Sequence, residues 1–246
     1  MAAALQKGEP MQAVILAGGQ GRRLHPYTAV LPKPLMPIGD VPILEVVVRQ
    51  LKRAGFTEVT MAVGYLAELL MAYFGDGHKL GVQVRYSREE VPLGTAGPLS
   101  LVERPDEPFL VMNGDLLTTL DYHSLWDRHR ERDAIATLAT FRRDVKIDLG
   151  VIETDREGWV RGYIEKPTYH YTVSTGIYVF EPSVLDYIPP QQRMDLPDLI
   201  RKLLASGERV ATYTFEGIWL DIGRWEDYER AAQEFEQHRS EFIPAE

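Results

Sequence analysis

Short apolar segments alternate with amphipathic segments through the first half of the chain, and this alternation constrains the fold more than any other feature of the sequence. Most of the short segments are apolar at consecutive positions, as the buried strands of a parallel sheet are. Such a sheet needs helices on both faces, so the pattern predicts an α/β fold with a mainly parallel central sheet. We expect strands at 13–16, 58–64, 82–86 and 109–112, and helices at 42–54, 66–74, 95–102 and 121–132.

Beyond residue 132, strand segments follow one another with few helices between them. This change predicts a smaller mixed or antiparallel part carried on the same core. No linker rich in Pro, Gly or Ser separates the two parts, so we expect one domain over residues 11–246 that follows a loose extension at 1–10. The further elements are expected as strands at 135–141, 150–153, 159–164, 176–180 and 210–215, and as helices at 197–205 and 224–242.

Composition excludes several classes of protein. The chain has no cysteine, which excludes a disulfide scaffold, a zinc–thiolate site and a cysteine nucleophile. Its 27 Lys and Arg against 36 Asp and Glu give a net charge of −9, which argues against a general nucleic-acid or anionic-membrane binder. The sequence shows neither the apolar core of a signal peptide nor an uncharged stretch of the ~20 residues that a spanning helix needs. We therefore expect a soluble cytoplasmic protein that binds neither nucleic acid nor membrane.

A glycine-rich loop follows the first expected strand. Its glycines at 18, 19 and 21 leave room for backbone N–H groups to approach a ligand. Residues 10–39 contain no acidic residue, and their three fixed cations are Arg22, Arg23 and Lys33. In an acidic chain such a window predicts a local anion site, and several phosphates are its natural ligand. The alternative is a tight turn with solvated arginines.

The common phosphate-binding loops do not match this one. A Walker motif needs Gly-Lys-Ser or Gly-Lys-Thr where this chain has Gly-Arg-Arg. A dinucleotide fingerprint needs a third glycine where this chain has Leu24. We therefore expect the loop to bind phosphate in another way.

The segment LAGGQGRRLHPYTAVLPKP at 16–34 resembles the signature G-x-G-T-R-L-x-P-x-T-x-x-x-P-K-P of the sugar-1-phosphate nucleotidylyltransferases, also called NDP-sugar pyrophosphorylases. This chain has Arg22 where the family usually has Thr. The resemblance continues through LGTAGPLSL, NGDLL, EKP, STGIYVFEP and WLDIGRWEDY, and covers the chain from residue 11 to about 235. It implies a Rossmann-like fold of the nucleotide-diphospho-sugar transferase type, with a smaller sugar-binding part. Some relatives add a C-terminal β-helix domain, which we do not expect here.

The resemblance implies that an NTP and a sugar 1-phosphate react to give an NDP-sugar and pyrophosphate. In the family the glycine-rich loop wraps the triphosphate, and an arginine and a lysine hold its phosphates. By the resemblance, these two residues are Arg23 and Lys33 in this chain. The other positions that the resemblance gives to the nucleotide are Leu16, Ala17, Gly18, Gly19, Gly21, Arg22, Gly94 and Thr95.

Two aspartates are candidate metal ligands. Asp115 follows the strand expected at 109–112, where ligands of α/β sheets bind, and Asp221 follows a short apolar segment. Each alone is equally typical of a helix cap or a turn, and spacing does not pair them. The resemblance pairs them as ligands of Mg²⁺, which commonly takes carboxylates together with phosphate oxygens.

The sugar side of the site is assigned by the resemblance, because an isolated Glu-Lys-Pro is otherwise a surface charge pair before a turn. By the resemblance, Glu165 contacts sugar hydroxyls, Lys166 holds the sugar phosphate, and Gly150 lets the backbone approach the sugar. Ser174 and Thr175 stand where the family's sugar pocket usually has Asn and Ala, which leaves the identity of the sugar open.

The implied chemistry needs no strong general base, because a phosphate monoester is already anionic near neutral pH. Such transfers depend chiefly on positioning and charge neutralisation. Lys166 would hold the attacking phosphate, while Arg23 and Lys33 would stabilise the departing pyrophosphate. The implied catalytic residues are Arg23, Lys33, Asp115 and Lys166.

The segment SREEVPLGTAGPL at 87–99 most resembles the mannose-1-phosphate guanylyltransferases. Guanine presents N1–H and N2–H₂ donors on one edge, and a carboxylate such as Glu89 or Glu90 can accept both. This favours GTP, with mannose 1-phosphate or a related hexose or heptose 1-phosphate. The alternatives are that both carboxylates are solvated loop charges, and that the substrates are UTP, dTTP or CTP with glucose 1-phosphate.

Two remoter alternatives keep the fold but change the function. A glycosyltransferase that consumes an NDP-sugar typically has a D-x-D motif, whereas Asn113-Gly-Asp115 lacks the first acid. A non-catalytic sensor of NDP-sugar would be expected to lose a loop cation or a metal-binding acid, and this chain keeps them. Many relatives form dimers or tetramers, so a homo-oligomer is compatible with the resemblance.

Overall fold

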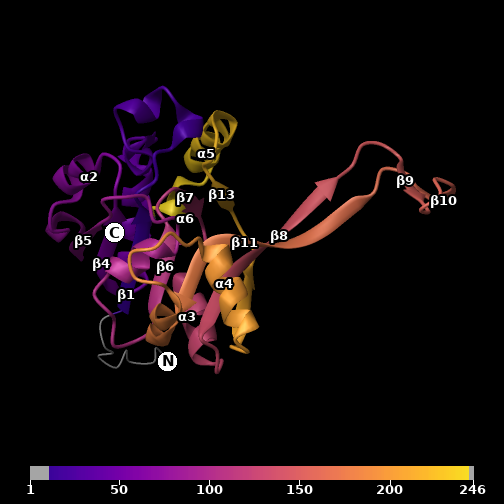
Figure 1. Ribbon diagram of the computed structural model, residues 1–246. Coiled ribbons are helices and arrows are strands. Elements are labelled where there is room, and N and C mark those ends of the chain that lie inside the picture. Colours follow the sequence, from indigo (N-terminus) through magenta and orange to yellow (C-terminus); the bar gives the residue numbers. More distant parts are fainter. Residues whose placement is uncertain (1–10, 244–246) are drawn as a thin grey trace, which may run out of the picture.

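The computed structural model describes residues 11–243, and its centre is a seven-stranded sheet (Figure 1). The predicted extension at 1–10 lies outside the described residues. The strands of the sheet are β1 (Met11–Ala17), β4 (Phe56–Val63), β5 (Gln83–Arg88), β6 (Phe109–Asn113), β8 (Ala136–Lys146), β11 (Thr168–Phe180) and β12 (Val210–Phe215).

The strand order is β12-β8-β11-β6-β1-β4-β5. Every neighbouring pair is parallel except the two that include β11, which runs against the other strands. The prediction of a mainly parallel α/β sheet is therefore confirmed. Within the described residues, no helix combines the length and the apolar character needed to cross a membrane.

Helices cover both faces of the sheet, as its apolar strands require. On one face pack α1 (Ile43–Arg53), α2 (Ala67–Phe74) and α3 (Tyr122–Arg130), and on the other packs α4 (Leu196–Ala205). The α3 helix begins where the sequence predicts, because the Asp121 carboxylate accepts the backbone N–H groups of His123 and Ser124 at 3.0 and 3.3 Å. The lone Asp at this boundary was thus a reliable helix-start signal.

The C-terminal helix differs from the prediction of one helix over 224–242. It divides at His238 into α5 (Trp225–Gln237) and α6 (Arg239–Phe242). The break lets α6 turn back, so that the Phe242 ring stacks on the Phe235 ring with centroids 5.9 Å apart, and both side chains are fully buried. Burial of this second aromatic ring stabilises the break by the hydrophobic effect.

The helix expected at 95–102 is only the 3-10 helix η5 (Gly97–Leu101). The N–H groups of Ala96 and Gly97 both donate to the Met194 carbonyl, at 2.9 and 3.0 Å. The start of the segment is thus tied to a distant loop instead of to a helical turn of its own.

A small second sheet brings two distant segments of the chain together. In it, β7 (Leu116–Thr118) pairs antiparallel with β13 (Trp219–Asp221), and Asp221 lies opposite Leu116. The loop that follows β6 and the C-terminal segment therefore share one edge of the fold. A further pair, β2 (Pro37–Ile38) and β3 (Val41–Pro42), leads into α1.

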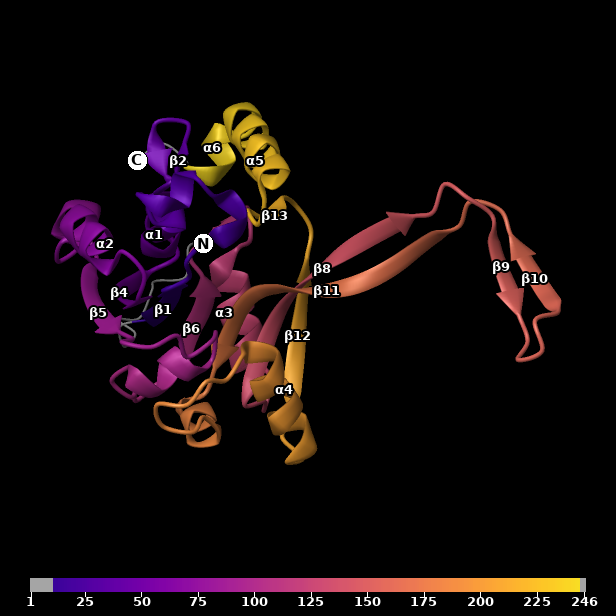
Figure 2. The same ribbon diagram turned by 45° about the horizontal axis from the view of Figure 1, so that its top comes forward.

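The smaller antiparallel part predicted after residue 132 is built as a long arm (Figures 1 and 2). Strands β8 and β11 run on together beyond the sheet, and a hairpin of β9 (Val151–Thr154) and β10 (Val160–Ile164) forms the outer end. We call residues 142–173 the arm. None of these residues is buried, whereas the inner parts of β8 and β11 are mostly buried.

Candidate functional site

A cavity of about 1180 Å³ lies at the carboxyl ends of the central strands. Its lining takes residues from the end of β1, the end of β4, the end of β5 and the end of β6, together with the glycine-rich loop. This is the edge at which open α/β sheets bind ligands. The volume exceeds the range of about 300–1,000 Å³ usual for small-molecule sites, so a nucleoside triphosphate fits.

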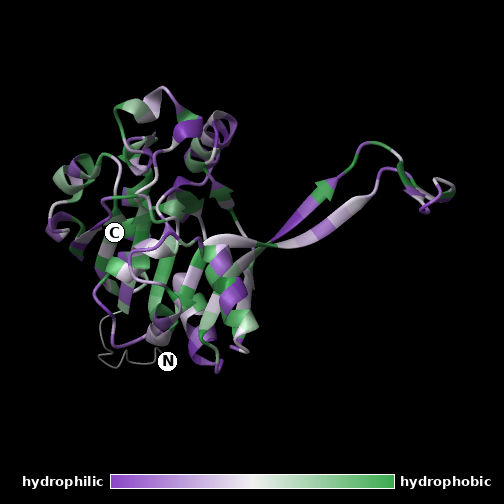
Figure 3. Ribbon diagram, viewed as in Figure 1, coloured by the Kyte–Doolittle hydropathy of each residue, from purple (hydrophilic) through white to green (hydrophobic). Residues whose placement is uncertain are grey.

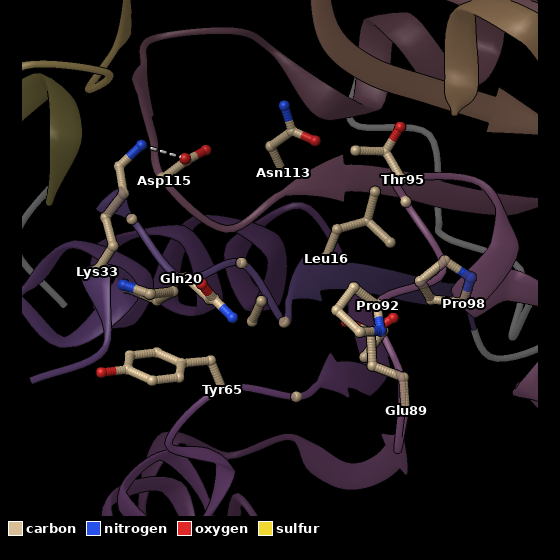
Figure 4. Close-up of a pocket in the computed structure, with 18 of the residues that line it drawn as sticks. Leu16, Gln20, Lys33, Tyr65, Glu89, Pro92, Thr95, Pro98, Asn113 and Asp115 are labelled. Carbon is tan, nitrogen blue, oxygen red and sulfur yellow. Dashed lines mark hydrogen bonds and ion pairs between the residues drawn. The ribbon is translucent and has the colours of Figure 1, made fainter. Parts of the chain in front are cut away.

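One end of the cavity is formed by Lys33 and Asp115, whose charged groups form an ion pair (Figure 4). Lys33 lies in the 3-10 helix η3 (Lys33–Leu35) and is only 7% exposed, so its ammonium group depends on that pair. The pair uses Oδ2 of Asp115, while the buried Oδ1 has no hydrogen-bond partner. A buried carboxylate oxygen without a donor is one that a bound cation could satisfy.

Asp221 lies beside this end of the cavity through the pairing of β7 with β13. The backbone N–H of Ile222 donates to the Asp115 carbonyl at 3.3 Å. The pKa of Asp221 is raised, first by its partial burial and then by the negative charge of Asp115, while Lys33 and Arg23 act in the opposite direction. The charge of Asp115 thus acts on Asp221 over a short distance, so the two carboxylates are close enough to share a cation.

The Arg23 guanidinium extends from the glycine-rich loop to the same place. A Cβ at Gly223, two residues after Asp221, would lie 3.2 Å from Nη1 of Arg23. The absence of a side chain at Gly223 therefore makes room for the guanidinium. The cations of the loop and Asp115 thus meet at one end of the cavity, and Asp221 lies beside that end without being part of the lining.

Glu89 lies at the other end of the cavity, near Pro92 and Pro98 (Figure 4). One of its carboxylate oxygens accepts the Leu93 N–H at 2.9 Å. The other lies over Gly18 and Gly64, where an added Cβ would come within 2.5 and 2.9 Å of it. The two glycines therefore leave space for this carboxylate. Its contacts with them and with Leu93 hold the Glu89 side chain in one place.

Gly94 and Thr95 belong to a wall that the loop before α4 supports. Thr95 donates its N–H to the Asp195 carboxylate at 3.1 Å, and its hydroxyl accepts the Leu196 N–H at 2.7 Å. Gly94 has φ of +81°, and a Cβ there would overlap the backbone of Met194. Only glycine combines this conformation with such close contact.

The structure places twelve of the residues expected from the sequence in the lining of this one cavity. Those expected to bind nucleotide or to act in catalysis there are Leu16, Ala17, Gly18, Gly19, Gly21, Arg22, Arg23, Lys33, Glu89, Gly94, Thr95 and Asp115. They come from segments up to about a hundred residues apart in sequence, and their meeting in one cavity agrees with a shared ligand.

The expected sugar-side residues do not line the cavity. Gly150, Glu165 and Lys166 lie on the arm, while Ser174 and Thr175 lie at its root, where β11 bulges against β8. Thr175 is buried and its hydroxyl donates to the Ala139 carbonyl at 2.8 Å. The sugar-binding roles of all five remain predictions.

Several cavity residues were not expected from the sequence. Gln20 lies within the glycine-rich loop, and the N–H of Tyr65 donates to the Gly18 carbonyl of that loop at 3.2 Å. Asn113 lies two residues before the predicted metal ligand Asp115, and Arg193 comes from the loop before α4. Gln20 and Asn113 adjoin expected residues, which is the signal that could have found them. Arg193 has no such signal, because its loop is distant in sequence from every other part of the lining.

Most of the chain is similar to known proteins. A family model described as nucleotidyl transferase matches residues 12–238. The chain is 39% identical over 241 residues to the UTP–glucose-1-phosphate uridylyltransferase of Synechocystis sp., covering 90% of this chain and 62% of that protein. It is 35% identical over 228 residues to the mannose-1-phosphate guanylyltransferase of Mycobacterium tuberculosis, covering 90% and 64%. The chain thus spans less than two thirds of these relatives.

The fold also matches a solved structure. HddC from Yersinia pseudotuberculosis superposes with a TM-score of 0.69 at 24% identity, over 92% of this chain and 99% of that chain. At this identity the match concerns the fold alone, and it agrees with the parallel sheet and its helices described above.

Proposed function

Because the chain belongs to the nucleotidyl transferase family, we propose that it joins a nucleoside triphosphate to a sugar 1-phosphate and releases pyrophosphate. The observation that carries this proposal is a cavity with Lys33, Arg23 and Asp115 at one end and Glu89 at the other. A triphosphate suits the cationic end, and a base suits the end with a fixed carboxylate. The relatives named above carry out reactions of this kind by their names.

In the proposed reaction, an oxygen of the sugar phosphate attacks the α-phosphorus of the nucleotide. The new P–O bond forms as the bond to pyrophosphate breaks, and the leaving group takes the electron pair. Arg23 and Lys33 lie where they can neutralise the charge that develops on pyrophosphate. The backbone N–H groups at Gly18, Gly19 and Gly21 can approach the phosphates without obstruction by side chains.

The two aspartates fit the Mg²⁺ that the sequence predicts. Asp115 has an oxygen without a donor, and the pKa of Asp221 is raised first by desolvation and then by the negative charge of Asp115, which a cation would offset. Hard carboxylate oxygens beside a triphosphate are the ligands that Mg²⁺ prefers. We propose that Asp115 and Asp221 hold Mg²⁺, which when bound would neutralise charge on the transferring phosphoryl group. Among the described residues, no cluster of three or more His, Asp or Glu side chains offers another site.

Glu89 favours GTP among the nucleotides. Its carboxylate is fixed by Leu93 and lies against Gly18 and Gly64, and a carboxylate can accept both guanine donors. The name of the Mycobacterium tuberculosis relative agrees with guanylyl transfer to mannose 1-phosphate. The name of the Synechocystis relative favours the second candidate, UTP with glucose 1-phosphate. The cytoplasmic location expected from the sequence stays a prediction.

A panel of nucleotides and sugars tests the proposed function. GTP, UTP, dTTP and CTP are each combined with mannose, glucose, glucosamine and heptose 1-phosphates, with and without Mg²⁺, and pyrophosphate release is measured. We expect Mg²⁺-dependent turnover, highest with GTP and mannose 1-phosphate or a related sugar. A preference for UTP, dTTP or CTP overturns guanylyl transfer but keeps the reaction. Turnover with none of the combinations overturns the reaction itself.

Replacing Gly18 by alanine is expected to weaken GTP binding by roughly tenfold or more, because the new Cβ displaces the Glu89 carboxylate from its place. Gly19→Ala measures the effect of a side chain in the loop alone: Gly19 also lines the cavity, but nothing lies within 4 Å of its Cβ position, so its loss is expected to be the smaller one. Titration calorimetry with GTP measures both variants. Equal losses in the two variants would show that the loop, and not Glu89, accounts for the change.

A further inference from the structure

The arm extends from the body of the protein, and no other part of residues 11–243 covers it (Figures 1 and 2). It continues the β8–β11 ladder outward, from the pair Arg142–Thr172 to the pair Lys146–Thr168. A hairpin of two strands has too little buried apolar surface to be stable by itself in water. The arm therefore needs a surface to pack against.

The arm carries an unusual share of exposed apolar side chains, and green segments recur along it in Figure 3. Eight of its large apolar side chains are exposed, and the most exposed are Leu149 (74%), Trp159 (67%), Val160 (63%) and Tyr163 (62%). The rest of the described chain is several times as long and has the same number. Apolar side chains gathered on one exposed segment mark an interaction surface.

Three of the residues expected at the sugar lie together on this arm. The Tyr163 hydroxyl donates to the Glu165 carboxylate at 3.0 Å, and it lies so close to Gly150 that a Cβ there would overlap it. Lys166 has φ of +46°, a strained conformation for a residue with a side chain. The backbone beside it is held by the hydrogen bond from Ile147 N–H to the Pro167 carbonyl, at 3.0 Å. This is an ordered cluster with an exposed cation, away from the chain's own cavity.

The cavity, in turn, receives nothing from the arm. Its lining in the described residues comes from residues 16–115, Arg193 and Gly223, and none of it from the arm. The arm leaves the body beside the cavity, since Gly176 at its root packs closely against Asn113 of the lining. Each copy of the chain thus has an arm that packs against no other described part of that chain. It also has a cavity that the expected sugar-side residues do not line.

Charge indicates which partner the arm fits. The arm holds six basic and six acidic residues, so it is neutral in a chain of net charge −9. Several of these charges pair within the arm, such as Arg161 with Asp155 at 2.7 Å. An arm without net charge does not suit a nucleic acid or an anionic membrane, which need net positive charge. It meets no repulsion from a second copy of this acidic chain.

We propose that two copies of the chain exchange arms, so that each arm packs on the partner's body and brings Lys166 to the partner's cavity. This inference rests on the proposed function, in which Lys166 holds the sugar 1-phosphate. Exchange of an identical element between two copies is a low-cost route to a symmetric dimer, because both copies make the same contacts. Each of the two sites is then complete only in the dimer.

The mass of the particle in solution tests the interface without any measurement of turnover. By light scattering we expect the wild type to have twice the 27.9 kDa mass of one chain. The Trp159→Asp variant is expected to have the mass of one chain, because it places a charge among the exposed apolar side chains of the arm. Leu204→Asp is the matched control, since Leu204 is 55% exposed on α4 of the body, and this variant is expected to stay a dimer. A single-chain wild type, or a Trp159→Asp variant that is still a dimer, overturns the proposal.

The absence of cysteine in the chain allows a direct test of exchange. Gly19→Cys in the cavity and Lys166→Cys on the arm are produced together on separately tagged copies, purified through both tags, and treated with a short thiol cross-linker. We expect a covalent product of double mass, which neither variant gives alone. A second preparation carries both cysteines on one copy paired with a wild-type copy. A cross-link within that one copy, without a product of double mass, would show that the arm serves its own cavity and overturn exchange.

Turnover by a mixed dimer tests whether the exchanged Lys166 acts in the partner's site. A copy with Asp115→Asn has a damaged cavity and an intact arm, and a copy with Lys166→Ala has the reverse. If arms are exchanged, the mixed dimer has one complete site and about half the wild-type rate per dimer, while each variant alone is nearly inactive. A mixed dimer as inactive as its parents contradicts exchange. Full activity of Lys166→Ala alone would refute the role of Lys166 in the proposed function, while the mass and cross-linking results would still decide the exchange.

Discussion

Asp115→Asn is expected to lower turnover by roughly 10²-fold or more, with a chain that remains folded. Asn keeps the size of the side chain and an oxygen for Lys33, but it removes the negative charge beside the unpartnered Oδ1. The charge of Lys33 is still offset in part by Asp221, whose pKa responds to Lys33. Turnover is therefore expected to fall because the reaction loses charge neutralisation, and not because the chain unfolds. The rate of pyrophosphate release measures turnover, and the melting temperature reports whether the chain stays folded.

Asp121→Asn is the matched control for this substitution. Asp121 lies six residues further along the chain and caps α3, where Asn caps about as well, and it does not line the cavity. Its turnover and melting temperature are expected to change little. Near-normal turnover of Asp115→Asn, or an equal loss in both variants, would remove Asp115 from the catalytic site.

Lys33→Ala should lower turnover to a similar extent, because it removes the cation that faces the departing pyrophosphate. Since Lys33 and Asp115 form one ion pair, their effects are not expected to add, and the double variant should lose little more than either single one. Additive losses would show that the two groups act independently.

The sequence was sufficient for the parts of the site that are local. The acid-free window and its glycines predicted an anion site, and the structure places all three cations of the window, Arg22, Arg23 and Lys33, in the lining of the cavity. It was not sufficient for Asp221, because its approach to Asp115 depends on pairing between β7 and β13, about a hundred residues apart. No spacing rule within one sequence reports such a pairing, and only the resemblance suggested it.

The same reasoning explains why the strands of the outer hairpin were predicted but the outward extension of β8 was not. The strand predicted at 135–141 ends at Phe141, and the charged residues Arg142, Arg143 and Asp144 follow it. In the structure β8 continues to Lys146, since β11 supplies a partner for each added residue. Strand length here is set by backbone pairing with a distant segment. Hydrophobic pattern alone therefore predicted the buried part of the strand and missed the exposed part.

Glu89→Gln is expected to lower kcat/KM for GTP by roughly 10²-fold, and to change that for UTP by less than about threefold. The carboxylate is held by the Leu93 N–H at 2.9 Å, and Gln can keep this contact, so the fold should not change. What Gln loses is the second charged acceptor, because its amide nitrogen donates where guanine also donates. Two donors facing each other leave both unsatisfied, and uracil does not present the same pair.

Glu90→Gln separates this specific effect from a general loss of charge. Glu90 is the neighbouring residue, it also lines the cavity, and it is exposed. Its replacement removes the same charge at nearly the same distance from the nucleotide, so any long-range effect of charge should appear equally in both variants. A large loss with GTP in Glu89→Gln alone assigns guanine recognition to Glu89. A loss in Glu90→Gln alone moves that role to Glu90, and a loss in neither leaves UTP as the better candidate, because a uridine site needs no carboxylate at this end of the cavity.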